Sequence, residues 1–453
     1  MRRKFLKYVI PSVSAMWIFS LYTMATGIVV AKGVSEIALA ALSISMPFVN
    51  ITFAVAVLFS VGASTVASIY LGNKENKKAN EIFTMCAVIL SFISIAVTVL
   101  VLLNLESIAY FLGATDKTIV FVKEYLGILS IFGIFAMLSD YFEVLVKADG
   151  HPQLAAAGMG IAAIVNILFV YLFVIKMNIG IKGAALAAGF AYAASTLFYV
   201  LHFIRNGSKL KFVSFKFNFS ILKRVIPLGL SDSVTEFSAG FIIFMFNRVI
   251  LRNVGETGII TYTVIVFVNS FVTTTMAGIS QGTQPLISYY YGRDDERTYT
   301  YFLKNAIQTT GLISLVIYVV STIFAKEIVG VYINKNQAEI FDYAVRSLRL
   351  YAPAYLLMGF NYIFAGFYTA IEKPVYSMIV SVGRGLLVIT ASLFAMTSLF
   401  GSEGIWMSSF VSETICLILS TAMFIKLYYR NLFTGRITEN ACIQGHISSG
   451  LTP

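Results

Sequence analysis

The sequence predicts an all-α integral membrane protein, with twelve transmembrane helices in two parallel six-helix repeats. Three observations predict this fold class. The 453 residues are 58% hydrophobic and 12% charged, with a mean hydropathy of +0.83, whereas soluble domains carry roughly 25% charged residues. Apolar runs of about 20 residues, long enough to cross a bilayer core as a helix, recur along the chain. Several short motifs also return about 220 residues later.

Twelve apolar runs account for the predicted spans. They centre near residues 20, 58, 93, 134, 165, 192, 240, 274, 313, 357, 387 and 415. A β-barrel would need short alternating strands instead, so a helical bundle is favoured. The first run follows Arg2, Arg3 and Lys4 and has the layout of a signal peptide. We expect it to be retained, because the repeat gives it a counterpart in the seventh run.

Four pairs of segments return in the same order, at offsets of 216, 220, 222 and 221 residues. Duplicated halves with so constant an offset are typical of secondary transporters. The matching pairs are 6–11 with 222–227, Gly62 and Gly72 with Gly282 and Gly292, His151 and Pro152 with Lys373 and Pro374, and 180–183 with 401–404.

The repeat divides the chain into two lobes. Residues 1–205 form the predicted N-lobe with helices 1–6, and residues 223–430 form the predicted C-lobe with helices 7–12. A basic cytoplasmic linker, 206–222, joins them, and a polar cytoplasmic tail follows at 431–453. Six spans are an even number, so the second lobe re-enters the membrane in the same sense as the first. Two such lobes face each other across a cleft, which predicts alternating access by rocking.

The distribution of charge predicts the orientation of the chain. It has 33 Lys and Arg against 22 Asp and Glu, a net charge of +11. With both termini cytoplasmic, the inner loops and termini hold 21 of the basic residues and the outer loops hold 11. This asymmetry predicts a multi-pass protein of the cell inner (plasma) membrane with both ends inside. The basic linker is expected to lie near anionic lipid headgroups and not to bind nucleic acid.

Motifs for metal or enzyme chemistry are not evident in the sequence. The three cysteines and three histidines are scattered, without ligand spacing such as CxxC or HxxxH, so we expect no metal and no cofactor. The metalloprotease HExxH pattern and a P-loop are missing too, which argues against a membrane-embedded enzyme. A channel is disfavoured because no filter-like motif occurs. We expect the protein to act as a monomer.

Several segments together resemble one family of transporters. Residues 276–289 (MAGISQGTQPLISY) resemble the eighth-helix signature of the MATE (multidrug and toxic compound extrusion) family. Residues 36–41 (EIALAA) with Pro47 resemble its first-to-second helix region, and 149–152 (DGHP) with 180–187 (GIKGAALA) its fourth-to-sixth helix region. The resemblance runs in register over roughly residues 5–430 and points to the bacterial multidrug efflux branch.

The resemblance implies a two-lobed bundle of twelve helices that exports organic cations by antiport with H⁺ or Na⁺. One branch of the family keeps N-lobe acidic and polar residues at positions that are Thr26, Val170 and Ala188 here. A fourth-helix position that is polar or acidic in relatives is Glu143. The missing N-lobe residues lead to the hypothesis that ion coupling shifts toward the C-lobe.

Five carboxylates lie at predicted bilayer depth, where an ionisable group costs about 2.5–3.5 kcal/mol on insertion scales. Asp140 and Glu143 share one face of helix 4. Asp232 and Glu236 share one face of helix 7, while Glu413 stands apart. A close acidic pair in a low dielectric cannot easily stay doubly ionised. A proton, Na⁺ or a cationic substrate then competes for the same charge, as antiport requires. We favour Glu143 and Glu236 as the main acceptors.

Alternative roles remain open for the other acids. Asp140 could be the partner of a basic side chain, and Asp232 could be an interfacial charge at the start of its helix. Amide groups are further candidates for the cleft, although they also serve as hydrogen-bonding contacts between helices. These amides are Asn166, Asn361, Gln281 and Gln284. Arg384 is expected to form a structural ion pair.

Aromatic residues make up 14% of the chain. Some could line a site for flat cations through cation–π contact, and their ordinary alternative is the core or the interface belt. The candidates are Tyr141, 289–291 and Tyr362.

The main alternative function is a flippase for a lipid-linked oligosaccharide or another lipid-like anionic cargo. The cavity of such a flippase should be rich in Arg and Lys. Buried acids outnumber buried bases in this sequence, where Arg384 is the deepest base. The charge balance therefore favours organic cations as substrates.

Overall fold

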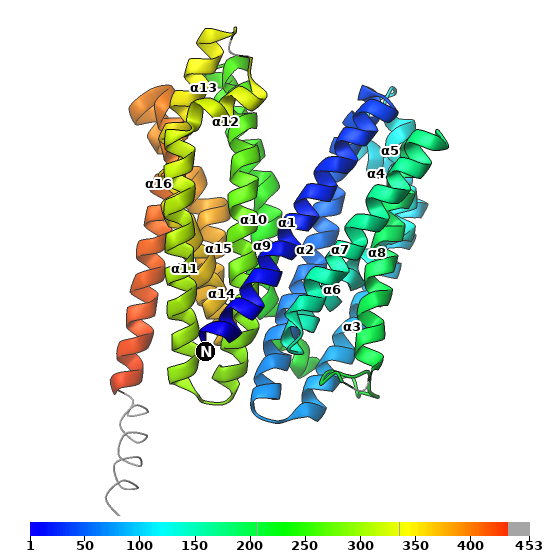
Figure 1. Cartoon of the computed structure of the whole chain (residues 1–453), viewed down its shortest axis with the longest axis vertical. Helices are drawn as coiled ribbons and strands as arrows, with labels where there is room; N and C mark the ends of the chain where they lie inside the picture. The colour runs from blue at the N-terminus through cyan, green and yellow to red at the C-terminus, as the bar shows by residue number, and fades with distance from the viewer. Residues whose placement is uncertain (206, 335, 434–453) are drawn as a thin grey trace, which may run out of the picture.

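The computed structural model (Figure 1) describes residues 1–205, 207–334 and 336–433, without the side chains at 31, 32, 36 and 428–433. Within these ranges the chain is helical nearly throughout and has no β-strand. The predicted all-α fold class is confirmed. Most of the predicted tail, from position 434 to 453, lies outside the described residues.

The helices form two groups that diverge toward the upper end of Figure 1. The first group is α1 (Arg2–Gly33), α2 (Glu36–Gly72), α3 (Asn76–Leu103), α4 (Leu105–Phe111), α5 (Ile119–Ile131), α6 (Gly133–Ala148), α7 (Pro152–Val170), the π-helical turn η1 (Tyr171–Lys176) and α8 (Ile181–Ile204). The second is α9 (Phe219–Asn253), α10 (Glu256–Gly292), α11 (Glu296–Ile323), α12 (Ala325–Tyr332), α13 (Ala338–Tyr351), α14 (Ala354–Ala370), α15 (Pro374–Val382), the π-helical turn η2 (Gly383–Leu387) and α16 (Val388–Phe433).

The number of membrane spans depends on how bent helices are counted. Among the described residues, nine helices are long and apolar enough to cross a membrane, and two bent pairs raise the number to eleven. One of the nine, Pro374–Leu427, has 54 residues, which would be about 80 Å as a straight helix, against a bilayer core of about 30 Å. Gly401 breaks that stretch with φ 59° and ψ −137°. Two spans there would give twelve, which stays a prediction.

Bends occur at equivalent places in the two groups. The axes of α5 and α6 meet at 55°, and those of α13 and α14 meet at 42°. The C-cap residues that follow α5 and α13 are Phe132 and Ala352, which are 220 positions apart. Pro353 follows the second bend and has no N–H for a helical hydrogen bond, so it favours a break there.

The internal repeat is also present in the backbone. Three pairs of residues with positive φ stand 220 to 222 positions apart, all in connections between helices. Such a conformation is uncommon outside glycine, so its recurrence marks the same turn built twice. The pairs are Lys74 with Asp294, Gly150 with Glu372, and Gly180 with Gly401.

Glycines hold the two groups together near the lower end of Figure 1. A Cβ at Gly72 of α2 would collide with the carbonyl oxygen of Tyr289 in α10, and a Cβ at Gly292 of α10 would collide with that of Ile69 in α2. Gly62 of α2 meets the carbonyl of Val225 in α9 in the same way. The repeated glycine pairs of the sequence therefore allow close backbone contact between the lobes.

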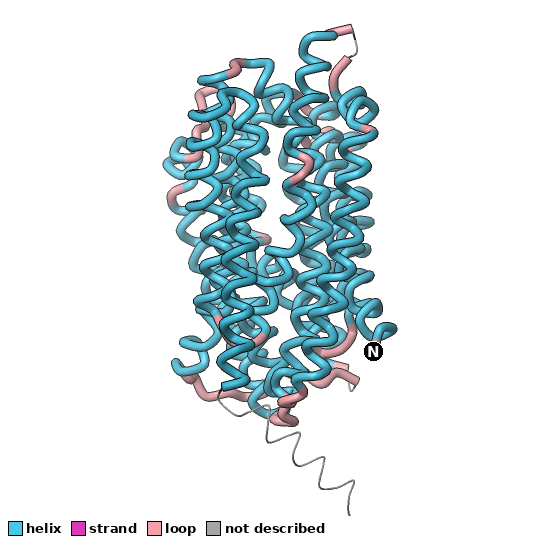
Figure 2. The backbone as a smooth tube through the Cα atoms, turned by 90° about the vertical axis from the view of Figure 1, so that its left-hand side faces the viewer, coloured by secondary structure: helices cyan, strands magenta, loops and turns pink. Residues whose placement is uncertain are grey.

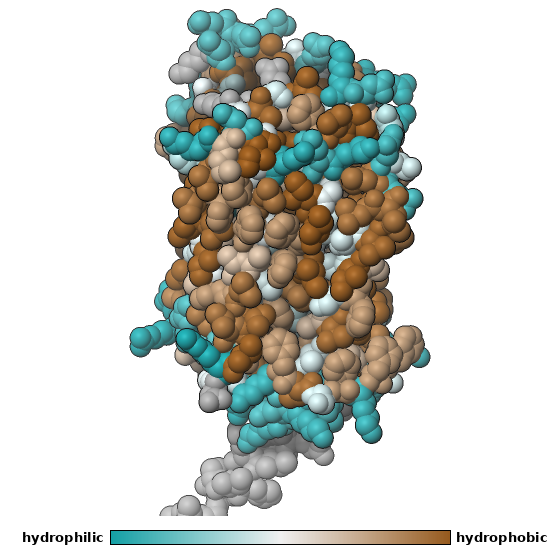
Figure 3. Space-filling view, turned by 90° about the vertical axis from the view of Figure 1, so that its right-hand side faces the viewer, coloured by the Kyte–Doolittle hydropathy of each residue, from teal (hydrophilic) through white to brown (hydrophobic). Residues whose placement is uncertain are grey.

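The surface carries the pattern expected of a membrane protein. Figure 3 shows a hydrophobic belt across the middle of one face, with hydrophilic residues gathered at both ends. Loops lie mainly at the two ends of the bundle, and helices fill the space between them (Figure 2). Residue 1 and the end of α16 lie at the same end of the molecule (Figure 1).

Candidate functional site

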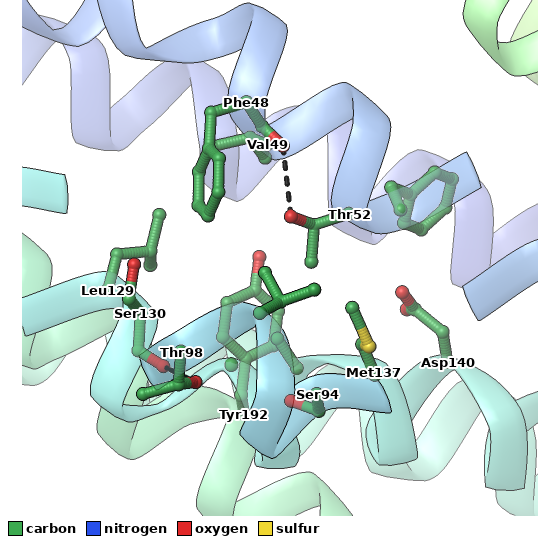
Figure 4. Close-up of a pocket in the computed structure, with 14 residues that line it drawn as sticks. Phe48, Val49, Thr52, Ser94, Thr98, Leu129, Ser130, Met137, Asp140 and Tyr192 are labelled. Atoms are coloured by element: carbon green, nitrogen blue, oxygen red, sulfur yellow. Dashed lines mark hydrogen bonds between the residues drawn. The ribbon is translucent and has the colours of Figure 1, made fainter. Parts of the chain in front are cut away.

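Asp140 of α6 reaches a small cavity inside the N-lobe (Figure 4). The cavity has a volume of about 40 Å³ and is lined by side chains of α2, α3, α5, α6 and α8. Asp140 lies at one end in Figure 4, and Leu129 and Ser130 lie at the other. This volume holds roughly two or three water molecules, so it suits water or an ion and not a drug-sized molecule.

Hydroxyl groups add polar points to a cavity lining that is otherwise mostly apolar. The hydroxyls of Ser94 and Ser130 are buried and have no hydrogen-bond partner within the described part of the chain. Thr98, beside them, donates to the carbonyl of Ser130 at 2.7 Å. Buried hydroxyls that lack protein partners are normally satisfied by water. We therefore expect a hydrated pocket against the Asp140 carboxylate.

Glu143, the acid favoured from the sequence, is neutralised by a base. Its Oε2 lies 2.9 Å from Nζ of Lys147, one helical turn further along α6, and both side chains are buried. Lys147 also donates to Oε1 of Gln281 in α10 at 3.2 Å. The sequence analysis did not single out Lys147 and therefore missed this pair. The i,i+4 spacing of Glu143 and Lys147 was the signal that would have found it.

The acidic pair of the C-lobe has a different environment. Asp232 and Glu236 of α9 are half-buried, and neither has an ion-pair partner among the described side chains. One carboxylate oxygen of Asp232 is buried without a hydrogen bond. The predicted sharing of one helix face holds, since both lie in the continuous helix α9.

A second buried ion pair lies deep in the C-lobe. Arg384, in the π-helical turn η2, donates from Nε to Glu413 at 3.3 Å. Its guanidinium carbon lies 3.9 Å from the ring centroid of Tyr362, a cation–π contact. Asn361 donates to the other oxygen of Glu413 at 2.6 Å. The predicted structural ion pair of Arg384 is confirmed, and Asn361 belongs to the same network.

The remaining candidates are spread over both lobes. Thr26 of α1 and Asn166 of α7 come together, with the Thr26 hydroxyl 2.6 Å from Oδ1 of Asn166. Gln284 of α10 is buried, and its side-chain nitrogen has no hydrogen-bond partner among the residues that the structure describes. Gln281, as described, receives the hydrogen bond of Lys147. The predicted residues therefore form several separate groups in place of one site.

Most of the aromatic candidates have structural contacts. Tyr141 is buried in the N-lobe, where its hydroxyl donates to the carbonyl of Phe83 at 2.8 Å. Tyr290 accepts a hydrogen bond from Lys4 at 3.1 Å. Tyr289 lies against Gly72 at the contact between the lobes. The cations that contact these rings are the protein's own: Lys4 lies 4.8 Å from the ring centroid of Tyr290, as Arg384 does from that of Tyr362 at 3.9 Å. The core or interface alternative therefore describes Tyr141, Tyr289 and Tyr290 better than a substrate site does.

A pattern with catalytic associations occurs at 278–282, GISQG, which fits G-x-S-x-G. In hydrolases this pattern forms a sharp turn between a strand and a helix. Here it lies inside the continuous helix α10, and the Ser280 hydroxyl donates to the carbonyl of Tyr362 at 3.0 Å. The serine is engaged in packing between α10 and α14.

Two of the three histidines, far apart in the sequence, come together in the structure. His151, before α7, and His202, in the last turn of α8, meet around the buried carboxylate of Asp149. The ligand atoms of these three residues lie within 4.8 Å of one another. Fifty-one positions separate the histidines, so no local spacing predicted the cluster.

Charge compensation distinguishes the five buried or half-buried acids from one another. Glu143 and Glu413 are each paired with a buried base. Asp140, Asp232 and Glu236 have no such partner among the described side chains. These uncompensated acids make the interior of the protein negative and suited to a cation.

Comparison with known proteins agrees with this architecture. A model of the MatE family matches the chain twice, at residues 11–172 and 233–394, so the two matches begin 222 residues apart. Multidrug export protein MepA of Staphylococcus saprophyticus is 24% identical over 405 residues, covering 87% of this chain and 87% of that protein. MepA of Staphylococcus aureus is 26% identical over 404 residues, covering 88% of each.

Solved structures share the fold. An outward-facing multidrug resistance MATE family transporter of the MOP superfamily has a TM-score of 0.86 and 20% identity, over 92% of this chain and 93% of that one. A MOP superfamily transporter of Pyrococcus furiosus, described as having a binding pocket of reverse polarity, has a TM-score of 0.86 and 19% identity, over 95% and 96%.

Proposed function

The chain belongs to the MatE family, and on that premise we propose that it is a secondary active exporter of organic cations. Members of this family are multi-pass transporters of the cell membrane and not enzymes. Multidrug export is the activity named for the MepA relatives. The driving force in the proposal is antiport with H⁺ or Na⁺, and both termini lie in the cytoplasm.

The observation that carries the proposal is the uncompensated buried charge. Asp140, Asp232 and Glu236 have no base beside them among the described side chains. Leaving carboxylates ionised without a partner in a low dielectric costs several kcal/mol, so each tends to take up a proton or a cation. A bound drug cation and a coupling ion therefore exclude each other, which is the requirement for exchange.

The two lobes supply different parts of the proposed mechanism. In the C-lobe, Asp232 and Glu236 form an acidic pair that binds the coupling ion. In the N-lobe, Asp140 has a cavity of about 40 Å³ beside it, which we expect to hold water and to offer H⁺ or Na⁺ a second site beside the main one in the C-lobe. Glu143 is assigned a structural role, because Lys147 already neutralises it. This assignment replaces the preference for Glu143 that the sequence suggested.

Alternating access follows from the contacts between the lobes. Glycines of α2 and α10 seal the lower end of Figure 1, while the helices diverge toward the upper end. With the loops of the lower end in the cytoplasm, this arrangement corresponds to a state closed toward the cytoplasm. Rocking of the lobes would break the glycine contacts and close the opposite end.

The test is transport by the purified protein in liposomes. A fluorescent organic cation, ethidium, is followed first under a pH gradient and then under a Na⁺ gradient. We expect one gradient to drive ethidium export. Asp140→Asn and Glu236→Gln should each lower the driven rate by roughly tenfold or more. Glu106→Gln, which removes an exposed carboxylate outside the cavity, serves as the matched control.

Each contrary result has a definite meaning. Movement of ethidium that neither gradient changes would rule out antiport of this cation. Transport of an anionic lipid-linked oligosaccharide in its place would establish the flippase alternative. If Glu143→Gln abolished coupling while Glu236→Gln left it intact, the assignment of coupling to the C-lobe would be wrong.

A further inference from the structure

Three polar side chains meet at the lower end of the N-lobe, apart from the proposed transport site. Asp149 ends α6, His151 precedes α7, and His202 lies in the last turn of α8. The Asp149 carboxylate is fully buried, the His202 side chain is 13% exposed and the His151 side chain is 41% exposed. Transport by the proposed mechanism assigns no role to these residues.

The distances fit a small metal ion. Oδ2 of Asp149 lies 3.0 Å from Nδ1 of His151 and 2.8 Å from Nε2 of His202. Tetrahedral zinc, with bonds of about 2.0–2.1 Å, places its ligand atoms roughly 3.3 Å apart. The two imidazole nitrogens lie within 4.8 Å of each other. Binding would therefore move each nitrogen a few tenths of an ångström away from Oδ2 and bring the two nitrogens to a similar separation.

The carboxylate is held in place by a second set of contacts. Its other oxygen, Oδ1, accepts hydrogen bonds from the backbone N–H groups of Lys209 at 2.7 Å and Leu210 at 2.8 Å. Metal-binding carboxylates are commonly oriented by such outer hydrogen bonds, which leave one oxygen free for the metal. The exposed edge of His151 provides access from the cytoplasmic side.

We propose that Asp149, His151 and His202 bind a divalent transition metal ion, with zinc as the fitting species and a water molecule as fourth ligand. Two imidazoles and one carboxylate suit Zn²⁺, Co²⁺ or Ni²⁺, whereas Mg²⁺ and Ca²⁺ prefer oxygen ligands throughout. The bound ion would join α6, α7 and α8. Through Asp149 it would also fix the segment at 209–210, which leads from the N-lobe into α9.

The experiment measures metal binding by the purified full-length chain, carried on an affinity tag without histidine. Zn²⁺ binding is followed by competition with a chromophoric chelator, and Co²⁺ binding by the visible absorption of tetrahedral cobalt. We expect one ion per chain. His151→Gln and His202→Gln should each weaken binding by roughly tenfold or more. The third histidine, His446, lies outside the described residues, and His446→Gln is the matched control, expected to bind as the unaltered chain does.

A stability measurement guards against misfolded variants. Ligands that bind only the folded state raise the unfolding temperature. Zn²⁺ should therefore raise the Tm of the unaltered chain and of His446→Gln, but not that of His151→Gln. If the unaltered chain binds no Zn²⁺ in the competition assay, the proposal is overturned and the cluster is a hydrogen-bonded cap. Binding that survives both His151→Gln and His202→Gln would overturn it as well.

Discussion

At the scale of single residues, buried charge is the feature that matters most. Lys147 is fully buried and has two contacts, the Glu143 carboxylate in its own helix and Gln281 in the opposite lobe. A charge in such a place is costly unless it is paired. Lys147 thus stabilises the buried charge of Glu143 and, through Gln281, also connects α6 to α10.

We predict that Lys147→Met destabilises the protein strongly. Removing one partner of a buried ion pair leaves the other charge unpaired, which typically costs about 3–5 kcal/mol. The double variant Glu143→Gln with Lys147→Met should regain most of that stability, because neither charge remains. Thermal unfolding in detergent measures both effects.

The control for this comparison is Lys182→Met. Lys182 forms an ion pair with Glu124 but is half exposed, so its loss should cost less than about 1 kcal/mol. A double variant as unstable as Lys147→Met alone would show that packing of the long side chain, and not charge pairing, is what the lysine contributes.

At the scale of helices, the close approach of α2, α9 and α10 depends on missing side chains. Gly62 of α2 faces the carbonyl of Val225, and Gly229 of α9 faces that of Leu58. A backbone carbonyl cannot move out of the way by changing rotamer, as a side chain can. A methyl group at either glycine must therefore push the helices apart.

We predict that Gly62→Ala and Gly229→Ala each lower export by weakening the closed end of the transporter. Overpacking of a tight contact typically costs about 1–3 kcal/mol. Here it would destabilise the state in which the two lobes are in contact. Ethidium transport in liposomes and thermal unfolding measure the effect. Gly160→Ala, where nothing lies within 4 Å of the added methyl, should behave as the unaltered chain. Equal behaviour of all three variants would contradict the role assigned to the contact.

At the scale of the whole molecule, the chain contains its own probe of lobe movement. It has two tryptophans. Trp406 is buried in the C-lobe, where it donates to Tyr343 at 3.1 Å. Trp17 of α1 crosses the boundary between the lobes, donating to Thr275 of α10 at 3.0 Å and stacking on Phe271 at 5.2 Å.

We predict that the emission of Trp17 changes when the lobes rock, because its hydrogen bond and its stacked neighbour belong to the other lobe. The measurement is tryptophan fluorescence of the protein in liposomes while ethidium-free pH or Na⁺ gradients are imposed. The Trp17→Phe variant, which keeps Trp406, should show no change. An identical response in that variant would place the signal in the C-lobe and not between the lobes.

The sequence was sufficient for the fold because the relevant signals are local or periodic. Runs of about 20 apolar residues and the pairs Gly62 with Gly72 and Gly282 with Gly292 already imply two matched helical halves. The number of spans is harder to predict for helical segments that bend or run together, such as Pro374–Leu427. Their number of spans depends on a single residue, Gly401, whose conformation the sequence does not show.

The candidate site was only partly predictable. The shared faces of Asp140 with Glu143 and of Asp232 with Glu236 follow from helical periodicity. Periodicity does not show which acids are neutralised, because neutralisation depends on partners from other turns and helices. Arg384 and Glu413, for example, are 29 positions apart. The cluster of Asp149, His151 and His202 could not be predicted for the same reason, because its members lie next to or within three different helices.

The reciprocal glycine contacts have the geometry of an isologous dimer interface. Gly72 of α2 meets α10, and its counterpart Gly292 of α10 meets α2, as identical subunits do about a twofold axis. If each half were a separate protein, two identical copies could pair through this glycine contact alone. Within one polypeptide the two halves need not be identical. Lys147 is an example, because the position 222 residues later is Thr369, which carries no charge.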